Sequence, residues 1–122
     1  MAGTVTVVEE HAASVKKITF TWLSDASGDA DGPTTIVLTG KIIRYVEIPD
    51  TGGTAPTTAY DVTIDDADGA DVLHGAGANI TVPGVKNVSE SDGLGSIKDS
   101  LLTLTVANAG NAKGGKSILY IR

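Results

Sequence analysis

The sequence predicts an all-β fold, namely an antiparallel β-sandwich or jelly-roll-like domain with about seven to eight strands and long loops. Three observations predict it. Apolar residues recur at every second position, Thr, Val and Ile are abundant, and 15 glycines and four prolines interrupt the chain at short intervals. The alternate positions carry mostly Thr or Asp, which is typical of a sheet that packs on one side. The length of 122 residues fits one domain over residues 1–122.

The first expected strands lie near the N-terminus. A short strand over residues 5–8 opens the chain, within a segment 1–12 that we also consider as an extended N-terminal arm. The next strand covers residues 18–23, where Ile18, Phe20 and Trp22 alternate with Thr19, Thr21 and Leu23. Because Trp22 shares the phase of the other two apolar residues, we interpret it as a core residue.

The longest strand signal runs over residues 33–49 and is apolar on both sides. Its even positions are nearly all apolar, and its odd positions include Val37, Ile43 and Tyr45. Because strands usually have about 3–10 residues, we predict a bend or bulge near Gly40. A strand with such a bend can pass from one sheet to the other.

Three further strand signals follow, with one aperiodic segment among them. Residues 60–65 and 102–107 alternate apolar side chains with Thr or Asp, whereas residues 118–121 are apolar on both sides. We expect residues 75–96 to form an extended loop or an edge strand. A helix over 94–101 is disfavoured because Gly93, Gly95 and Ser96 make a poor helix start.

The acidic turns leave one binding alternative open. The tetrapeptide Asp-Ala-Asp-Gly occurs at 29–32 and 66–69, and we interpret both copies as turns, because Asp-Gly readily closes hairpins. Clustered carboxylates also suit calcium, but neither loop has the Gly and Glu spacing of an EF-hand. We expect no metal and no cofactor, and we keep a calcium-binding module as an alternative.

Composition and motifs argue against several function classes. Lys plus Arg is 9, Asp plus Glu is 15 and the formal net charge is −6, which disfavours nucleic acid and anionic membranes as partners. No cysteine, catalytic serine motif or paired histidine motif is present, since His11 and His74 lie far apart. Residues 110–117 fit a loose phosphate-loop pattern, but a strand and not a helix is expected after them. We therefore predict a non-enzymatic protein without catalytic residues.

Several segments taken together carry a family resemblance. They are IPDTGGTAPT at 48–57, YDVTIDDADGADVL at 60–73, GAGAN at 75–79, NAGNA at 108–112 and the closing ILYIR. With them, residues 17–122 resemble small virion structural proteins of tailed bacteriophages, of the head decoration or cement type. The resemblance implies a β-sandwich or jelly-roll subunit that assembles as an oligomer on the virion, and it brings no catalytic residues with it.

The expected function is therefore that of a capsid decoration protein that stabilises the head shell. Its expected partners are further copies of itself, as a dimer or trimer, and the major capsid protein. Its expected location is the capsid surface of the virion, after synthesis in the host bacterial cytoplasm. The alternatives are a tail or connector protein of the phage and, in another class, a calcium- or carbohydrate-binding β-sandwich module. From the doubly apolar strands we predict subunit or capsid contacts at Val37, Ile43, Tyr45, Leu119 and Ile121.

Overall fold

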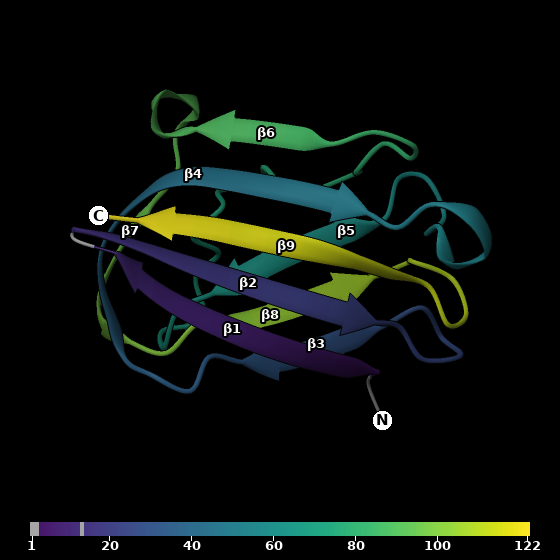
Figure 1. The fold of residues 1–122 in the computed structure, drawn as a ribbon, viewed down its shortest axis with the longest axis horizontal. Helices are drawn as coiled ribbons and strands as arrows, with labels where there is room; N and C mark the ends of the chain where they lie inside the picture. The colour runs from purple at the N-terminus through teal and green to yellow at the C-terminus, as the bar shows by residue number, and fades with distance from the viewer. Residues whose placement is uncertain (1–2, 13) are drawn as a thin grey trace.

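The computed structural model describes residues 3–12 and 14–122, and its strands form two antiparallel sheets packed face to face (Figure 1). Sheet A has the strand order β1-β2-β9-β4-β6, with β7 pairing β4 as well, and sheet B has the order β3-β8-β5. In Figure 1, sheet A lies in front of sheet B. The strands are β1 Thr4–Ala12, β2 Val15–Leu23, β3 Ala30–Pro33, β4 Leu38–Pro49, β5 Asp61–Asp65, β6 Lys86–Ser89, β7 Ser96–Ser100, β8 Thr103–Ala107 and β9 Gly114–Ile121. The predicted all-β fold class is confirmed.

Among residues 3–12 and 14–122, helical structure is confined to two short turns. The 3-10 helices are η1, Gly52–Thr54, and η2, Glu90–Asp92. Within the described part of the chain, no helix has the length and apolar character needed to cross a membrane.

The core lies between the two sheets. Sheet A contributes Ile18, Phe20 and Trp22 from β2, which are at most 2% exposed, so the prediction that Trp22 is a core residue is confirmed. Sheet B contributes Val62 and Ile64 from β5, together with apolar residues of β8. The period-two alternation of the sequence therefore corresponds to inward and outward side chains.

The long strand β4 contains the predicted bulge and a second one. Its register shifts between Leu38 and Gly40 against β7, and again between Ile42 and Arg44 against β9. Gly40 has φ of +144°, and an added Cβ there would lie 2.5 Å from the carbonyl oxygen of Arg122. A side chain at this position is therefore excluded both by backbone conformation and by space. The bend does not carry β4 into the second sheet, because both parts of β4 pair within sheet A.

Three further expectations need correction or refinement. Residues Thr4–Ala12 are not an extended arm, because they pair along their length with Val15–Leu23 as strand β1. The first Asp-Ala-Asp-Gly copy is not a turn, because its residues from Ala30 onward form β3. The turn lies just before it, where the side chain of Asp25 accepts hydrogen bonds from the backbone N–H groups of Ser27 and Asp29.

The aperiodic segment contains the edge strand that we considered. Lys86–Ser89 forms β6 at the edge of sheet A, beside β4. The disfavoured helix over 94–101 is absent, and Ser96–Ser100 forms strand β7 there.

Candidate functional site

Three of the five predicted contact residues are wrong, because they lie inside the sandwich. Tyr45, Leu119 and Ile121 are all 0% exposed, whereas Val37 is 59% exposed and Ile43 is half-buried. The second bulge in β4 causes part of this error. It reverses the alternation after Ile42, so that the odd positions Tyr45 and Glu47 point inward. On β9 both faces are apolar, and the face assigned to contacts is the inner one.

The outward side of sheet A is a better candidate surface, and we call it face A. Alternation with the buried residues places on it Lys17 and Leu23 from β2, Arg44, Val46 and Ile48 from β4, and Lys116, Ile118 and Tyr120 from β9. Val8 of β1 and Leu23 of β2 are 49% and 43% exposed. Face A thus combines the exposed apolar side chains of Val8 and Leu23, the threonines of β1 and β2 that share this side, and the cations Lys17, Arg44 and Lys116. Its edge carries Glu10, opposite Lys17 in the register of β1 and β2.

The aromatic ring of Tyr120 lies close to two of these cations. The Nζ atom of Lys17 lies 5.8 Å from the centre of the Tyr120 ring, and the guanidinium carbon of Arg44 lies 5.1 Å from it. The Nε–H of Arg44 also donates a 2.9 Å hydrogen bond to Oδ1 of Asn87 on β6. Ring and amide together hold the two charges in place on the sheet.

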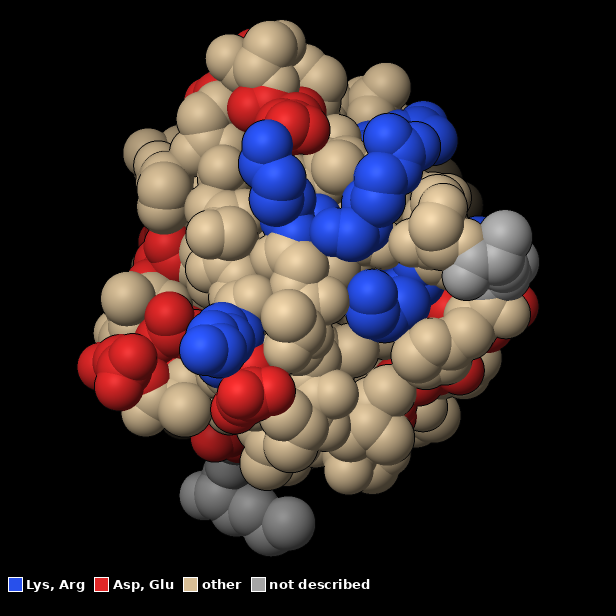
Figure 2. All heavy atoms as spheres, turned by 90° about the vertical axis from the view of Figure 1, so that its left-hand side faces the viewer, with Lys and Arg blue, Asp and Glu red and all other residues tan. Residues whose placement is uncertain are grey.

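Further cations gather at the end of the sandwich where β9 finishes. Lys16 pairs with Ile121 in the register of β2 and β9, and Lys41 exchanges backbone hydrogen bonds with Arg122. Figure 2 looks onto this end and shows Lys and Arg in its middle and upper right, with many of the Asp and Glu residues toward the rim. Lys41 is paired with Glu90 at 3.1 Å. The positive charge of an acidic chain is therefore concentrated at face A and this end.

The outward side of sheet B, which we call face B, has the opposite charge. Its side chains are Asp31 and Pro33 from β3, Asp61, Thr63 and Asp65 from β5, and Thr103, Thr105 and Ala107 from β8. None of these is a cation. A hollow of about 320 Å³ opens at β3 and β8, and its lining includes Asp29, Asp31 and Thr105.

A carboxylate is buried between the two sheets, on the inner side of sheet A. Glu47 of β4 is 0% exposed, as are Tyr45, Tyr60 and Ser117. The hydroxyl of Tyr45 donates to its Oε1 at 2.7 Å, that of Tyr60 donates to its Oε2 at 2.6 Å, and that of Ser117 also donates to Oε1. We call these four residues the Glu47 cluster. Tyr60 immediately precedes β5, so the cluster joins sheet A to sheet B.

Burial dominates the electrostatics of this cluster. Desolvation raises the pKa of Glu47 to about 7, although hydrogen bonds from Ser117, Tyr60 and Tyr45 favour its charged form. Burial and the neighbouring Glu47 raise the pKa of both tyrosines. The ring of Trp22 lies 5.4 Å from that of Tyr60, and its indole N–H is buried without an acceptor among the described residues. Because all four members of the cluster are closed to solvent, the arrangement serves to connect the sheets.

The acidic turns use their carboxylates on the backbone. Asp66 accepts hydrogen bonds from the backbone N–H groups of Asp68 and Ala70, and Asp71 accepts them from Ile64, Leu73 and Gly75. Within residues 3–12 and 14–122, no group of three or more His, Asp or Glu side chains is placed to hold a metal ion. These carboxylates therefore act as turn-forming residues, as the sequence predicts for the second Asp-Ala-Asp-Gly copy.

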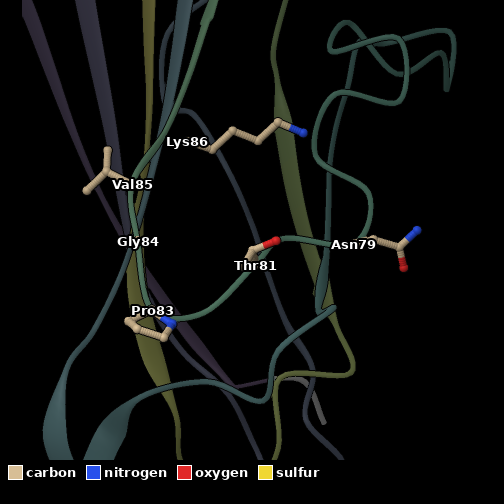
Figure 3. A pocket seen from close by; sticks show the side chains of 6 residues that line it. All are labelled: Asn79, Thr81, Pro83, Gly84, Val85 and Lys86. Atoms are coloured by element: carbon tan, nitrogen blue, oxygen red, sulfur yellow. The ribbon is translucent and has the colours of Figure 1, made fainter.

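A second hollow, of about 360 Å³, lies beside β6. Asn79, Thr81, Pro83, Gly84, Val85 and Lys86 line it. Figure 3 shows these residues along one curved segment, with Lys86 extending toward the part that carries Thr81 and Asn79. Val85 is exposed and points to the other side. One lysine, one hydroxyl and one amide on a single loop do not form a catalytic constellation.

The remaining motifs lack the context that their chemistry requires. His11 is on edge strand β1, and His74 is in the turn region before β6. The phosphate-loop-like segment 110–117 runs into β9, Gly114–Ile121, so a strand and not a helix follows it, as expected. Neither a scan against models of protein families nor a search among curated proteins finds a match to this chain.

Proposed function

We propose that this chain is a non-enzymatic structural protein of a tailed-bacteriophage virion, of the type that decorates and stabilises the head shell. In this role it binds further copies of itself and the major capsid protein. The family resemblance of residues 17–122 supports the phage assignment, since its segments are distinctive as a set.

The observation that carries the structural role is the distribution of polar chemistry in the molecule. The one deeply buried carboxylate that the structure describes is satisfied by three hydroxyls, and the turn carboxylates bind backbone N–H groups. The exposed features are instead broad sheet faces, with Val8, Leu23 and Lys116 on face A. Broad and rigid faces suit attachment to a lattice better than conversion of a substrate.

Binding to shells tests this function directly. Heads of the phage that encodes the protein are prepared without it, mixed with purified protein and sedimented, with isolated tails as the matched alternative target. We expect saturable co-sedimentation with heads and an increase in the temperature at which the heads rupture. Binding to tails alone would assign the protein to the tail or connector, and binding to neither target would overturn the proposal.

A further inference from the structure

We infer that copies of this chain associate asymmetrically, with face A of one copy on face B of the next. The inference rests on the self-association contained in the proposed function, and it names the two surfaces involved.

Charge complementarity selects this pairing over the symmetric ones. Face A carries Lys17, Arg44 and Lys116 against the single acid Glu10, and face B carries Asp31, Asp61 and Asp65 with no cation. Two A faces, or two B faces, bring like charges together, whereas A on B brings opposite charges together.

The Tyr120 ring on face A and the hollow on face B also favour the contact of face A with face B. Lys17 and Arg44 are held on either side of the Tyr120 ring, so that less side-chain freedom is lost when an anion approaches. On face B, the hollow with Asp29 and Asp31 in its lining has room for a cationic side chain. Threonine dominates the rest of face B, and its hydroxyls can pair with the polar rim of face A.

The apolar part of face A gives the contact a non-electrostatic component. Val8 and Leu23 are each more than two-fifths exposed, and Pro33 and Ala107 supply apolar surface on face B. Burying such area stabilises association at about 25 cal/mol per Å² before the costs of ordering are subtracted.

The two faces lie on opposite sides of the sandwich, as the layered view shows (Figure 1). A contact between two different patches is heterologous and leaves one face of each kind free at the ends of every assembly. The predicted products are therefore stacks that grow with concentration, and not a closed symmetric dimer.

Charge-reversal variants test the pairing by sedimentation equilibrium at low salt. K17E/K116E reverses the charge of face A, and D31K/T105K neutralises the charge of face B at two exposed side chains for which the structure records no hydrogen bond. K86E/K98E is the control, because it changes net charge as much as the first variant but lies outside both faces.

For the wild type we expect a mass that rises with concentration from 12.4 kDa to at least twice that value, and that falls back in 1 M salt. Each face variant alone is expected to stay monomeric, and an equimolar mixture of the two to regain association. The control is expected to behave as the wild type does.

Three results would overturn the inference: a wild type that is monomeric at several hundred micromolar, a D31K/T105K variant that associates normally, or a mixture that does not recover. A monomer that still binds heads refutes this pairing and leaves the proposed function standing. Stacks that form but bind no head refute the proposed function and leave this pairing standing. A 20-nucleotide single-stranded DNA that binds face A and blocks stacking would also count against the pairing, since it assigns the cations to nucleic acid.

Discussion

The two sides of sheet A hold their ionisable side chains in different ways. On the inner side, Glu47 is enclosed, and hydroxyl groups of β4, of β9 and of the residue before β5 donate to it. On the outer side, Lys17 and Arg44 stay in contact with solvent and are held only by an aromatic ring and one amide. Removing a partner from a buried polar group is costly, whereas an exposed charge is free to meet another molecule. Substitutions on the two sides should therefore differ in what they change.

The largest effect is expected from removing the buried carboxylate. Glu47→Ala leaves three hydroxyl groups without their acceptor and opens a cavity, so the free energy of unfolding should fall by about 3–5 kcal/mol. Urea denaturation followed by tryptophan fluorescence measures it. Glu10→Ala, at an exposed carboxylate of β1, is the matched control and should change stability by less than about 0.5 kcal/mol. Equal effects of the two substitutions would remove the distinction between the two sides.

The next largest effect is a dependence of stability on pH. The pKa of Glu47 is about 7 in the folded chain and near 4.5 when the group is free, so folding takes up a proton between these values. Stability should therefore decrease as pH rises from 4.5 to 7, by about 3 kcal/mol in all, and this contribution should be constant above pH 7. Denaturation at several pH values measures the slope.

Glu47→Gln is the control for this dependence. It does not titrate, so the slope between pH 4.5 and 7 should be flatter than in the wild type. Carbon-13 NMR of the Glu47 carboxyl group gives the pKa without any substitution. A midpoint near 4.5 would contradict the expected pH dependence.

A smaller effect is expected from the three tyrosines of the chain. Tyr60→Phe and Tyr45→Phe each remove one donor to Glu47, and each should cost about 1–3 kcal/mol. Tyr120→Phe keeps the ring on face A and should change stability by less than about 0.5 kcal/mol. Thermal melts of the three variants give the ranking, and a cost at Tyr120 equal to that at Tyr60 would contradict it.

The smallest effect on stability is expected on face A. Lys17→Met removes a half-exposed cation from the Tyr120 ring, which is worth about 0.5 kcal/mol or less. Its melting temperature should therefore stay within about 3 °C of the wild type. A large loss of stability would show that the outer cations, like the inner carboxylate, serve mainly to hold the fold.

The alternation of the sequence predicts the strands well, because most strands have one clearly apolar side. The residues 18–23, 60–65 and 102–107 correspond to most of β2, β5 and β8. Gly40 marks a bend correctly, since only glycine fits its backbone conformation and the close approach of Arg122. The strand alternation and the bend at Gly40 depend on neighbouring residues in the sequence, so one sequence is enough to predict them.

The face that points inward could not be derived wherever both sides of a strand are apolar. On β9 the predicted strand over residues 118–121 has Ile118 and Tyr120 on one side and Leu119 and Ile121 on the other, and the exposed Lys116, which marks the outer side, lies before those four residues. On β4 the second bulge determines which side chains point inward. Its extra residue is Ile43, and no glycine in the sequence marks its position. The Glu47 cluster could not be predicted for the same reason, because the sequence places Tyr45 on the outer side. The spacing Tyr-x-Glu within β4 is the one signal that points to a shared face for these two side chains.

The position of β9 has a consequence for how the chain reaches its fold. This strand follows all the others in the sequence, yet it lies between β2 and β4 in the middle of sheet A, and its Ser117 completes the Glu47 cluster. Until it has been synthesised, β2 and β4 have no common neighbour, and Glu47 lacks one of its three donors. Pairing over such distances along the chain slows folding and leaves strand edges open in the meantime. The sandwich is therefore expected to close late, in one cooperative step after β9 emerges from the ribosome, and a chain shortened before Gly114 should be prone to aggregate during synthesis.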